Sequence, residues 1–180
     1  MLQNYNEVIE LSKLKWCIID VDGTLTDSGI YFDSNGNELK KFSSRDFVGV
    51  MAAHYIGVKT MIVTGRECAA TKRRADEMRV DYLFQRVKDK KGFVKKFMDE
   101  NGIEACQLCY IGDDLNDYAS MKLAGFIACP ADACEEIKEM ANYVSSFNGG
   151  CGVLQDVFRY ILLKTGKWDR FLQDEVAKGY

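Results

Sequence analysis

Two aspartates separated by one residue follow an apolar segment near the start of the chain. Residues 16–19 are apolar throughout, as in a strand buried on both faces of a sheet. Asp20 and Asp22 come directly after them, and Gly23 permits a sharp turn. Ligands bind at the carboxyl ends of strands in an open α/β sheet, and crowded carboxylates repel each other unless a cation intervenes. Taken alone, the pattern predicts either a site for Mg²⁺, which prefers oxygen ligands, or an Asp-Gly turn after a core strand.

Two further apolar segments also end in polar residues. One ends at Thr64 and the other at Gly112-Asp113, while Lys90 lies between them in the sequence. The chain therefore contains, in order, an Asp-x-Asp strand end, a hydroxyl strand end, a lysine and a Gly-Asp strand end. Across residues 16–117 this ordered set resembles the four motifs of the haloacid dehalogenase superfamily of phosphohydrolases. The resemblance selects the Mg²⁺ site over the simple turn.

The composition is that of an ordinary globular protein. The 180 residues are 47% hydrophobic and 28% charged, which suits one α/β domain spanning residues 1–180. The net charge of −3 gives no indication of a nucleic-acid or anionic-membrane partner. No apolar segment is long enough to cross a bilayer, and residues 1–7 lack the basic start and apolar core of a signal peptide. We expect a cytoplasmic protein without membrane or nucleic-acid partners.

Cysteine and histidine usage argues against several enzyme classes. Cys17, Cys109 and Cys129 lie in apolar segments, so we expect them to be buried free thiols. The pair Cys106 and Cys109 has zinc-binding spacing, but a second such pair is missing, and structural zinc requires four ligands. The only histidine, His54, falls in a helical pattern and is expected at a packing edge. Cysteine and serine hydrolases, which usually need a histidine base, are therefore disfavoured.

Strand-like and helix-like segments alternate along the chain after a short polar helix at residues 1–13. Such alternation predicts an α/β, Rossmann-like fold, with a parallel sheet and helices on both faces. Strands are expected at 14–20, 58–63, 81–84, 107–111 and 125–128. Helices are expected at 46–56, 67–78, 89–101, 115–123 and 133–140.

Residues 30–42 interrupt this alternation with the pattern of a β-hairpin. Asn35-Gly36 is a strong turn signal, and the flanking segments carry aromatic and charged side chains. An isolated hairpin is only marginally stable, so it must pack on the domain or on another subunit. Only about 20 residues separate Thr26 from the helix at Asp46, too few for a separate cap domain. The chain therefore resembles the capless subclass of the superfamily.

Within that subclass the chain resembles the 3-deoxy-D-manno-octulosonate 8-phosphate phosphatase family almost from end to end. Phe47 stands where the family usually has Gly, and Gln155 stands where it usually has Arg. In the family the C-terminal tail, here about residues 165–180, closes over the active site, so Gln155 bears on what that tail contacts. The resemblance rests on Asp20–Thr26, the hairpin, Ser44–Asp46, Thr64–Arg66, Arg73–Ala75, Phe84-Gln85, Lys90, Gly112–Asp117, Cys129–Ala133, Asn148–Gly152 and Thr165–Trp168.

The resemblance implies a two-step mechanism with Mg²⁺ as cofactor. Asp20 would attack phosphorus to form an aspartyl-phosphate, and Asp22 would protonate the leaving sugar and then activate water. The Asp20 carboxylate, the Asp22 backbone carbonyl and Asp113 would hold the metal ion. Thr64 and Lys90 would bind the phosphoryl oxygens.

Several neighbouring residues have less direct expected roles. Asp117 would orient Lys90 or the metal shell without binding the metal, and Asp114 would cap the next helix or belong to the metal shell. Spacing alone does not distinguish Lys90 from Lys88 or Lys91; Lys90 is chosen because it aligns with the family lysine. The other lysines of this region (88, 91, 95 and 96) are expected on a solvated helix face.

The substrate implied by the resemblance is a sugar-acid phosphate, so an arginine should bind its carboxylate. Arg66 and Arg74 are the candidates, because arginine makes a two-pronged contact with carboxylates, whereas Arg73 is expected on the surface. Relatives that prefer nonulosonate phosphates tend to carry an acidic residue at the position of Arg66, which favours the octulosonate and hence lipopolysaccharide synthesis. The family also implies a homotetramer in which the hairpins form a central barrel and neighbours cover the sites.

Three alternatives remain from the sequence. A phosphatase for a nonulosonate 9-phosphate would share every catalytic residue. A non-catalytic oligomerisation module is disfavoured because all four motif carboxylates are retained. A phosphomutase uses the same aspartyl-phosphate, but it would need a cap to exclude water.

Overall fold

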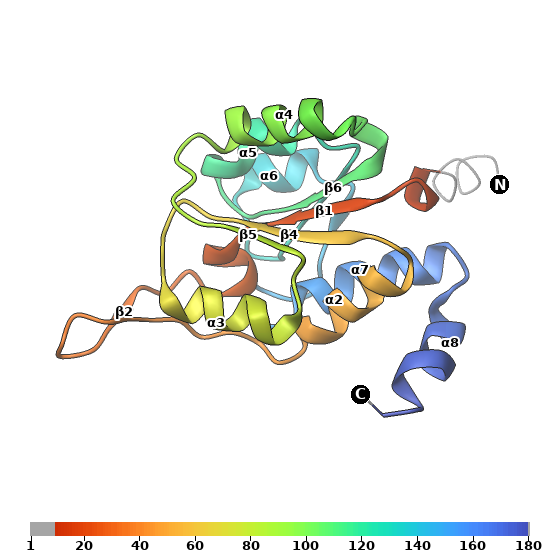
Figure 1. Ribbon diagram of the computed structural model, residues 1–180, viewed down its shortest axis with the longest axis horizontal. Helices are drawn as coiled ribbons and strands as arrows, with labels where there is room; N and C mark the ends of the chain where they lie inside the picture. Colours follow the sequence, from red (N-terminus) through yellow and green to blue (C-terminus); the bar gives the residue numbers. More distant parts are fainter. Residues whose placement is uncertain (1–9, 180) are drawn as a thin grey trace.

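A six-stranded parallel sheet forms the centre of the protein in the computed structural model, which describes residues 10–179. The strand order is β5-β4-β1-β6-β7-β8, and the separate hairpin consists of β2 and β3. Helices α4, α5 and α6 cover one face of the sheet, and α2, α3 and α7 cover the other (Figure 1). The strands are β1 (Trp16–Ile19), β2 (Tyr31–Phe32), β3 (Glu38–Leu39), β4 (Lys59–Val63), β5 (Tyr82–Phe84), β6 (Leu108–Ile111), β7 (Phe126–Cys129) and β8 (Tyr143–Val144). The helices are α2 (Asp46–Tyr55), α3 (Ala69–Met78), α4 (Lys90–Asn101), α5 (Leu115–Met121), α6 (Glu135–Met140), α7 (Val153–Lys164) and α8 (Trp168–Phe171), with short turns η1 (Val21–Leu25), η2 (Ala105–Gln107) and η3 (Leu172–Val176).

The central strand β1 is apolar because both of its faces are covered. It pairs in parallel with β4 on one side and β6 on the other, and Cys17 lies beside Cys109 in this register. Alternate residues of β1 enter two separate cores: Cys17 and Ile19 face α2 and α7, and Ile18 faces α4 and α5. Cys17, Cys109 and Cys129 are buried free thiols, as predicted.

The alternation in the sequence predicted this architecture closely. All ten expected strands and helices between residues 14 and 140 are present, and each end lies within two residues of its expected place. The α/β Rossmann-like fold is therefore confirmed. Of the helix expected at residues 1–13, residues 10–12 are helical and residues 1–9 lie outside the described part. Three elements were not predicted from the sequence: β8, α7 and α8.

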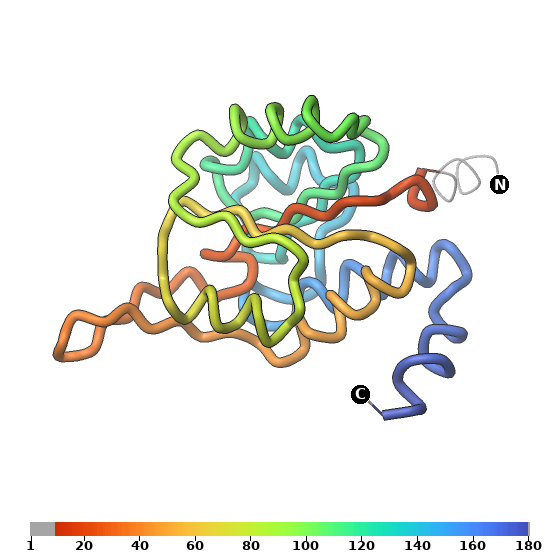
Figure 2. Tube along the Cα trace, in the orientation of Figure 1, coloured from red at the N-terminus to blue at the C-terminus, as the bar shows by residue number. Residues whose placement is uncertain are grey.

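The hairpin projects from the body of the molecule beyond the carboxyl ends of the strands (Figures 1 and 2). Its turn contains Gly36 at φ 81°, and the Asp33 carboxylate accepts backbone hydrogen bonds from Asn35 and Asn37, both at 2.8 Å. Asn-Gly is thus at the turn as predicted, and Asp33 organises it. Between η1 and α2 the chain adds only this hairpin, so the expectation of no cap domain is confirmed.

The described part of the C-terminal tail packs on the body of the same chain. Phe171 of α8 is fully buried beside Tyr55 of α2, and the Tyr55 hydroxyl donates a 2.9 Å hydrogen bond to Asp174. This tail lies at the end of the molecule away from the hairpin (Figure 1). Within residues 165–179, the tail of this chain therefore does not close over the strand ends of the same chain. No helix among residues 10–179 is both long and apolar enough to cross a membrane.

Candidate active site

The carboxyl ends of β1, β4 and β6 are adjacent and bring three predicted site residues together. Asp20, Thr64 and Asp113 follow these strands within two residues. Gly23, in the turn after β1, has φ +92°, and a Cβ atom there would lie 1.9 Å from an Asp113 carboxylate oxygen. The turn therefore requires glycine for both its conformation and the close approach of Asp113.

A largely buried cluster of three carboxylates and one ammonium group forms the centre of the site. Oxygens of Asp20, Asp113 and Asp117 lie within 4.8 Å of one another. The Lys90 Nζ donates to Asp20 Oδ1 at 2.7 Å and to Asp117 Oδ1 at 2.8 Å. The Tyr110 hydroxyl also donates to Asp117 Oδ1, at 2.7 Å. Lys90 is buried, whereas the lysines at 88, 91, 95 and 96 are exposed, as expected for those four.

Burial and the neighbouring charge of Asp117 raise the pKa values of Asp20 and Asp113. Burial, and then the charge of Asp117, raises the pKa of Asp20 well above its usual range, although Lys90 opposes the shift. The same two causes raise the pKa of Asp113 to about 7. Burial alone would lower the pKa of Lys90, but Asp20 and Asp117 outweigh it, so its pKa is raised and the amine stays protonated. With all three acids ionised, the cluster would have more negative than positive charge, and a bound cation would relieve this excess.

The donor set fits a magnesium ion. Oδ2 of Asp20 and Oδ2 of Asp117 are buried without a hydrogen-bond partner among the described residues. Asp113 Oδ1 accepts a hydrogen bond from the Thr24 hydroxyl at 3.2 Å, which fixes that carboxylate. Carboxylate oxygens with free lone pairs are the ligands that Mg²⁺ prefers. The site can thus hold the predicted metal.

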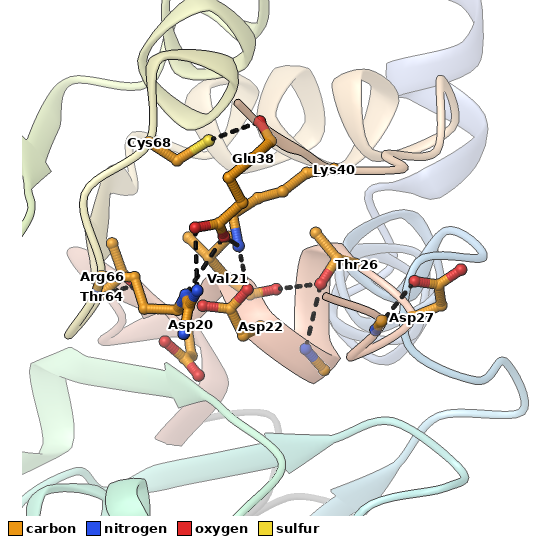
Figure 3. A network of polar contacts seen from close by, with 12 residues as sticks. Asp20, Val21, Asp22, Thr26, Asp27, Glu38, Lys40, Thr64, Arg66 and Cys68 are labelled. Carbon is orange, nitrogen blue, oxygen red and sulfur yellow. Dashed lines mark hydrogen bonds and ion pairs between the residues drawn. The ribbon is translucent and has the colours of Figure 1, made fainter. Parts of the chain in front are cut away.

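A second group of charged residues lies beside Asp22 and includes two residues that the sequence analysis missed. Lys40, next to β3, donates to Asp22 Oδ1, and its Nζ lies 2.9 Å from Glu38 Oε1 (Figure 3). Glu38 also accepts two hydrogen bonds from Arg66, at 3.2 and 2.9 Å. Arg66, whose side chain is 41% exposed, thus belongs to this second group of charged residues. Only the alternation of Glu38 and Lys40 along the strand could have shown that they share a face.

The remaining predicted residues divide into those near the cluster and those elsewhere. Thr64 is buried, and its hydroxyl accepts a 3.3 Å hydrogen bond from the Arg66 backbone. Arg74 donates to the Ser43 carbonyl at 2.8 Å and contacts Glu77, so its described partners lie outside the carboxylate cluster. Arg73 is exposed, as predicted.

Asp114 and His54 each have a described hydrogen-bond partner. Asp114 accepts a 2.8 Å hydrogen bond from the Leu115 backbone and caps α5, the first of its two expected roles. His54 is a helix residue paired with Asp81 at 2.9 Å, away from the carboxylate cluster. Of the pair with zinc-type spacing, Cys109 is fully buried in β6 and Cys106 is partly exposed.

The glycine-rich segment before α7 packs directly on the turn after β1. A Cβ atom on Gly149 would lie 2.0 Å from the Gly23 carbonyl oxygen, so only glycine fits there. The Gly149 N–H donates to Asp132 at 2.8 Å, and the Gly150 N–H donates to the Thr24 carbonyl at 3.1 Å. These contacts support the backbone that carries Asp20 and Asp22.

Comparison with known proteins gives the family. Residues 82–156 match the haloacid dehalogenase-like hydrolase family. Over 162 residues the chain is 32% identical to the 3-deoxy-D-manno-octulosonate 8-phosphate phosphatase KdsC of Escherichia coli K12, with 90% of this chain and 86% of that protein covered. The chain belongs to the 3-deoxy-D-manno-octulosonate 8-phosphate phosphatase family.

Solved structures agree with this membership. The phosphatase of this family from Moraxella catarrhalis, in complex with magnesium, phosphate and KDO, has a TM-score of 0.87 and 32% identity over 93% of this chain and 97% of that one. The cobalt-bound phosphatase from Haemophilus influenzae has a TM-score of 0.84 and 29% identity, also over 93% and 97%. The family predicted from the sequence motifs is therefore confirmed.

Proposed function

We propose that this protein is a Mg²⁺-dependent phosphatase that hydrolyses 3-deoxy-D-manno-octulosonate 8-phosphate to the free sugar acid and phosphate. The observation that carries the proposal is the buried cluster of Asp20, Lys90, Asp113 and Asp117 at the strand ends, in a chain of this phosphatase family. The magnesium, phosphate and KDO bound by the Moraxella catarrhalis relative support the same substrate here. The product would enter lipopolysaccharide synthesis.

The first chemical step transfers the phosphoryl group to the protein. An Asp20 carboxylate oxygen attacks phosphorus, and the bond from phosphorus to the sugar oxygen breaks. Asp22 donates a proton to the departing sugar oxygen. Thr64 and Lys90 bind the phosphoryl oxygens, and Lys90 is fixed for this task by its contact with Asp117.

The second step restores the protein. Asp22, now a carboxylate, takes a proton from a water molecule whose oxygen attacks the phosphorus of the aspartyl-phosphate. The bond between phosphorus and Asp20 breaks, which releases phosphate and the free Asp20 carboxylate. Asp20, Asp113 and the Asp22 backbone carbonyl would hold the magnesium ion, with Asp117 orienting Lys90 beside it. Bound Mg²⁺ supplies positive charge that reduces the repulsion between Asp20 and the phosphate.

Arg66 is the better of the two predicted contacts for the substrate carboxylate. It is anchored to Glu38 at the mouth of the site and remains partly exposed. The described partners of Arg74 are Ser43 and Glu77, so Arg74 could bind the substrate carboxylate only if the substrate extended to residues 43–44. The nonulosonate alternative has no observation in its favour here, and Arg66 argues against it.

The proposal extends to the assembly and its compartment. The hairpin exposes large apolar side chains, which supports a homotetramer assembled through the hairpins: Ile30, Tyr31, Phe32 and Leu39. The chain would work as one domain in the cytoplasm, where its free thiols stay reduced.

The direct test compares phosphate release from the octulosonate 8-phosphate and a nonulosonate 9-phosphate in the presence of Mg²⁺. We expect a higher kcat/KM for the eight-carbon substrate and loss of turnover in Asp20→Asn, which removes the nucleophile but keeps the side-chain size. Chelation of Mg²⁺ should abolish turnover reversibly. A preference for the nine-carbon substrate would reassign the substrate, and a wild type no faster than Asp20→Asn would refute catalysis.

A further inference from the structure

The side chain of Lys40 is buried, but the mechanism proposed above gives it no role. Its side chain is only 2% exposed, although the hairpin that carries it projects from the body. The ammonium group contacts two carboxylates, Asp22 and Glu38. An ammonium is strongly hydrated in water, so a buried one requires such paired charges.

Asp22 depends on this contact for its orientation. The bond from Lys40 to Oδ1 is the only hydrogen bond of the Asp22 carboxylate among the described residues. The terminal torsion of an aspartate is broad, so a carboxylate without a partner samples many orientations. Figure 3 shows Lys40 extending from the hairpin to Asp22. One charged hydrogen bond holds Oδ1 and leaves Oδ2 free to exchange protons.

The position of Lys40 is itself fixed from β4. Arg66, three residues after β4, holds Glu38 through two hydrogen bonds, and Glu38 holds the Lys40 ammonium. Residue Leu39, between them in the strand, is 52% exposed, as expected when successive side chains point to opposite sides. A chain of ionic contacts thus runs from the end of β4 through the hairpin to Asp22 after β1.

We propose that Lys40 is a positioning residue that holds the Asp22 carboxylate in place for proton transfer. The inference rests on the proposed function, because it assigns the acid–base role to Asp22. Positioning Asp22 affects the chemical steps, so loss of Lys40 should lower kcat. A lysine that bound the substrate instead would act mainly on KM.

The test measures kcat and KM for the octulosonate 8-phosphate and for p-nitrophenyl phosphate in Lys40→Met, Lys40→Arg and the matched control Lys41→Met. Lys41 is adjacent, 63% exposed and paired with Asp27. We expect Lys40→Met to lower kcat about 10- to 100-fold on both substrates, because both need Asp22 to activate water. KM should change little, Lys40→Arg should recover part of kcat, and Lys41→Met should match the wild type.

Other outcomes separate this inference from the proposed function. A raised KM with unchanged kcat in Lys40→Met, or unchanged kinetics, overturns the positioning role. A wild type active on p-nitrophenyl phosphate but not on the sugar phosphate refutes the proposed substrate, while kcat on the aryl phosphate still decides the role of Lys40.

If Lys40→Met fails to fold by circular dichroism, Glu38→Gln replaces it. That variant removes one anchor of Lys40 and should also lower kcat, and an unchanged kcat there overturns the inference.

Discussion

At the scale of single residues, the protein maintains three carboxylates close together in a largely buried place. Lys90 neutralises part of this charge and contacts two of the three acids. One ammonium group faces three carboxylates, so the neutralisation is incomplete, and burial and then the charge of Asp117 raise the pKa of Asp113 to about 7. Residues that attract a metal ion therefore also destabilise the protein without one.

Mg²⁺ should consequently stabilise the protein independently of turnover. A ligand that binds only the folded state adds about 2.7 kcal/mol to the free energy of unfolding at 100 times its Kd, which corresponds to a Tm increase of several degrees. We expect this increase in the wild type and its loss in Asp113→Asn. Differential scanning fluorimetry with and without MgCl₂ measures both.

Asp114→Asn is the matched control for this measurement. Asp114 neighbours Asp113 but caps α5, and asparagine is an equally good N-cap, so this variant should keep the Mg²⁺ response. A full response in Asp113→Asn would exclude that carboxylate as a metal ligand.

At the scale of elements, α7 connects the end of the sheet to the rest of the core. Its Asp156 Oδ2 accepts hydrogen bonds from the Ser145 hydroxyl at 2.8 Å, the Ser146 N–H at 3.0 Å and the Tyr143 hydroxyl at 3.0 Å. Burial alone would raise the pKa of Asp156, but these hydrogen bonds outweigh it and lower the pKa below its usual value of 3.8. One carboxylate thus holds the β8 segment on the helix.

Asp156→Asn should therefore destabilise the protein in a pH-dependent way. Because the folded-state pKa is depressed, the carboxylate contributes stability fully above the unfolded-state pKa and loses it as the pH falls through the folded-state value. We expect a loss of about 1–3 kcal/mol near pH 7 that shrinks below about pH 4. Urea unfolding at pH 7, 5 and 3.5 measures it, with the exposed Asp99→Asn of α4 as control. A difference that is constant across these pH values would contradict the assignment.

The sequence predicted the strands and helices between residues 14 and 140 because each carries its own periodic pattern. Helix α7 also carries such a pattern, with its apolar residues at Val153, Leu154, Val157, Phe158, Ile161 and Leu162, and it was readable from sequence. Strand β8 has two residues and no pattern of its own. Lys90 could be chosen over its neighbours only through the family alignment, since spacing does not reveal burial.

At the scale of the whole molecule, the hairpin belongs both to the site and to the surface. Glu38 and Lys40 reach the site, yet Phe32 is 62% exposed and Ile30, Tyr31 and Leu39 are also exposed. The alternation along the hairpin shows which residues share a face, but the direction in which the hairpin docks depends on tertiary contacts. For this reason the sequence could predict the hairpin without predicting Glu38 and Lys40 as site residues.

The projecting hairpin exposes apolar side chains, and contact with other copies of the chain would remove them from water. The double variant Ile30→Glu, Phe32→Glu places charges on β2 and its approach and leaves Glu38 and Lys40 unchanged. We expect light scattering to give four times 20.4 kDa for the wild type and 20.4 kDa for the variant. Leu163→Glu, at an exposed apolar position on α7, is the control and should stay assembled.

The monomeric variant should retain its circular dichroism but lose preference for the sugar phosphate over p-nitrophenyl phosphate, since no neighbour then covers the site. A monomeric wild type would refute the assembly, and a monomeric variant with full selectivity would show that each chain forms its substrate site alone.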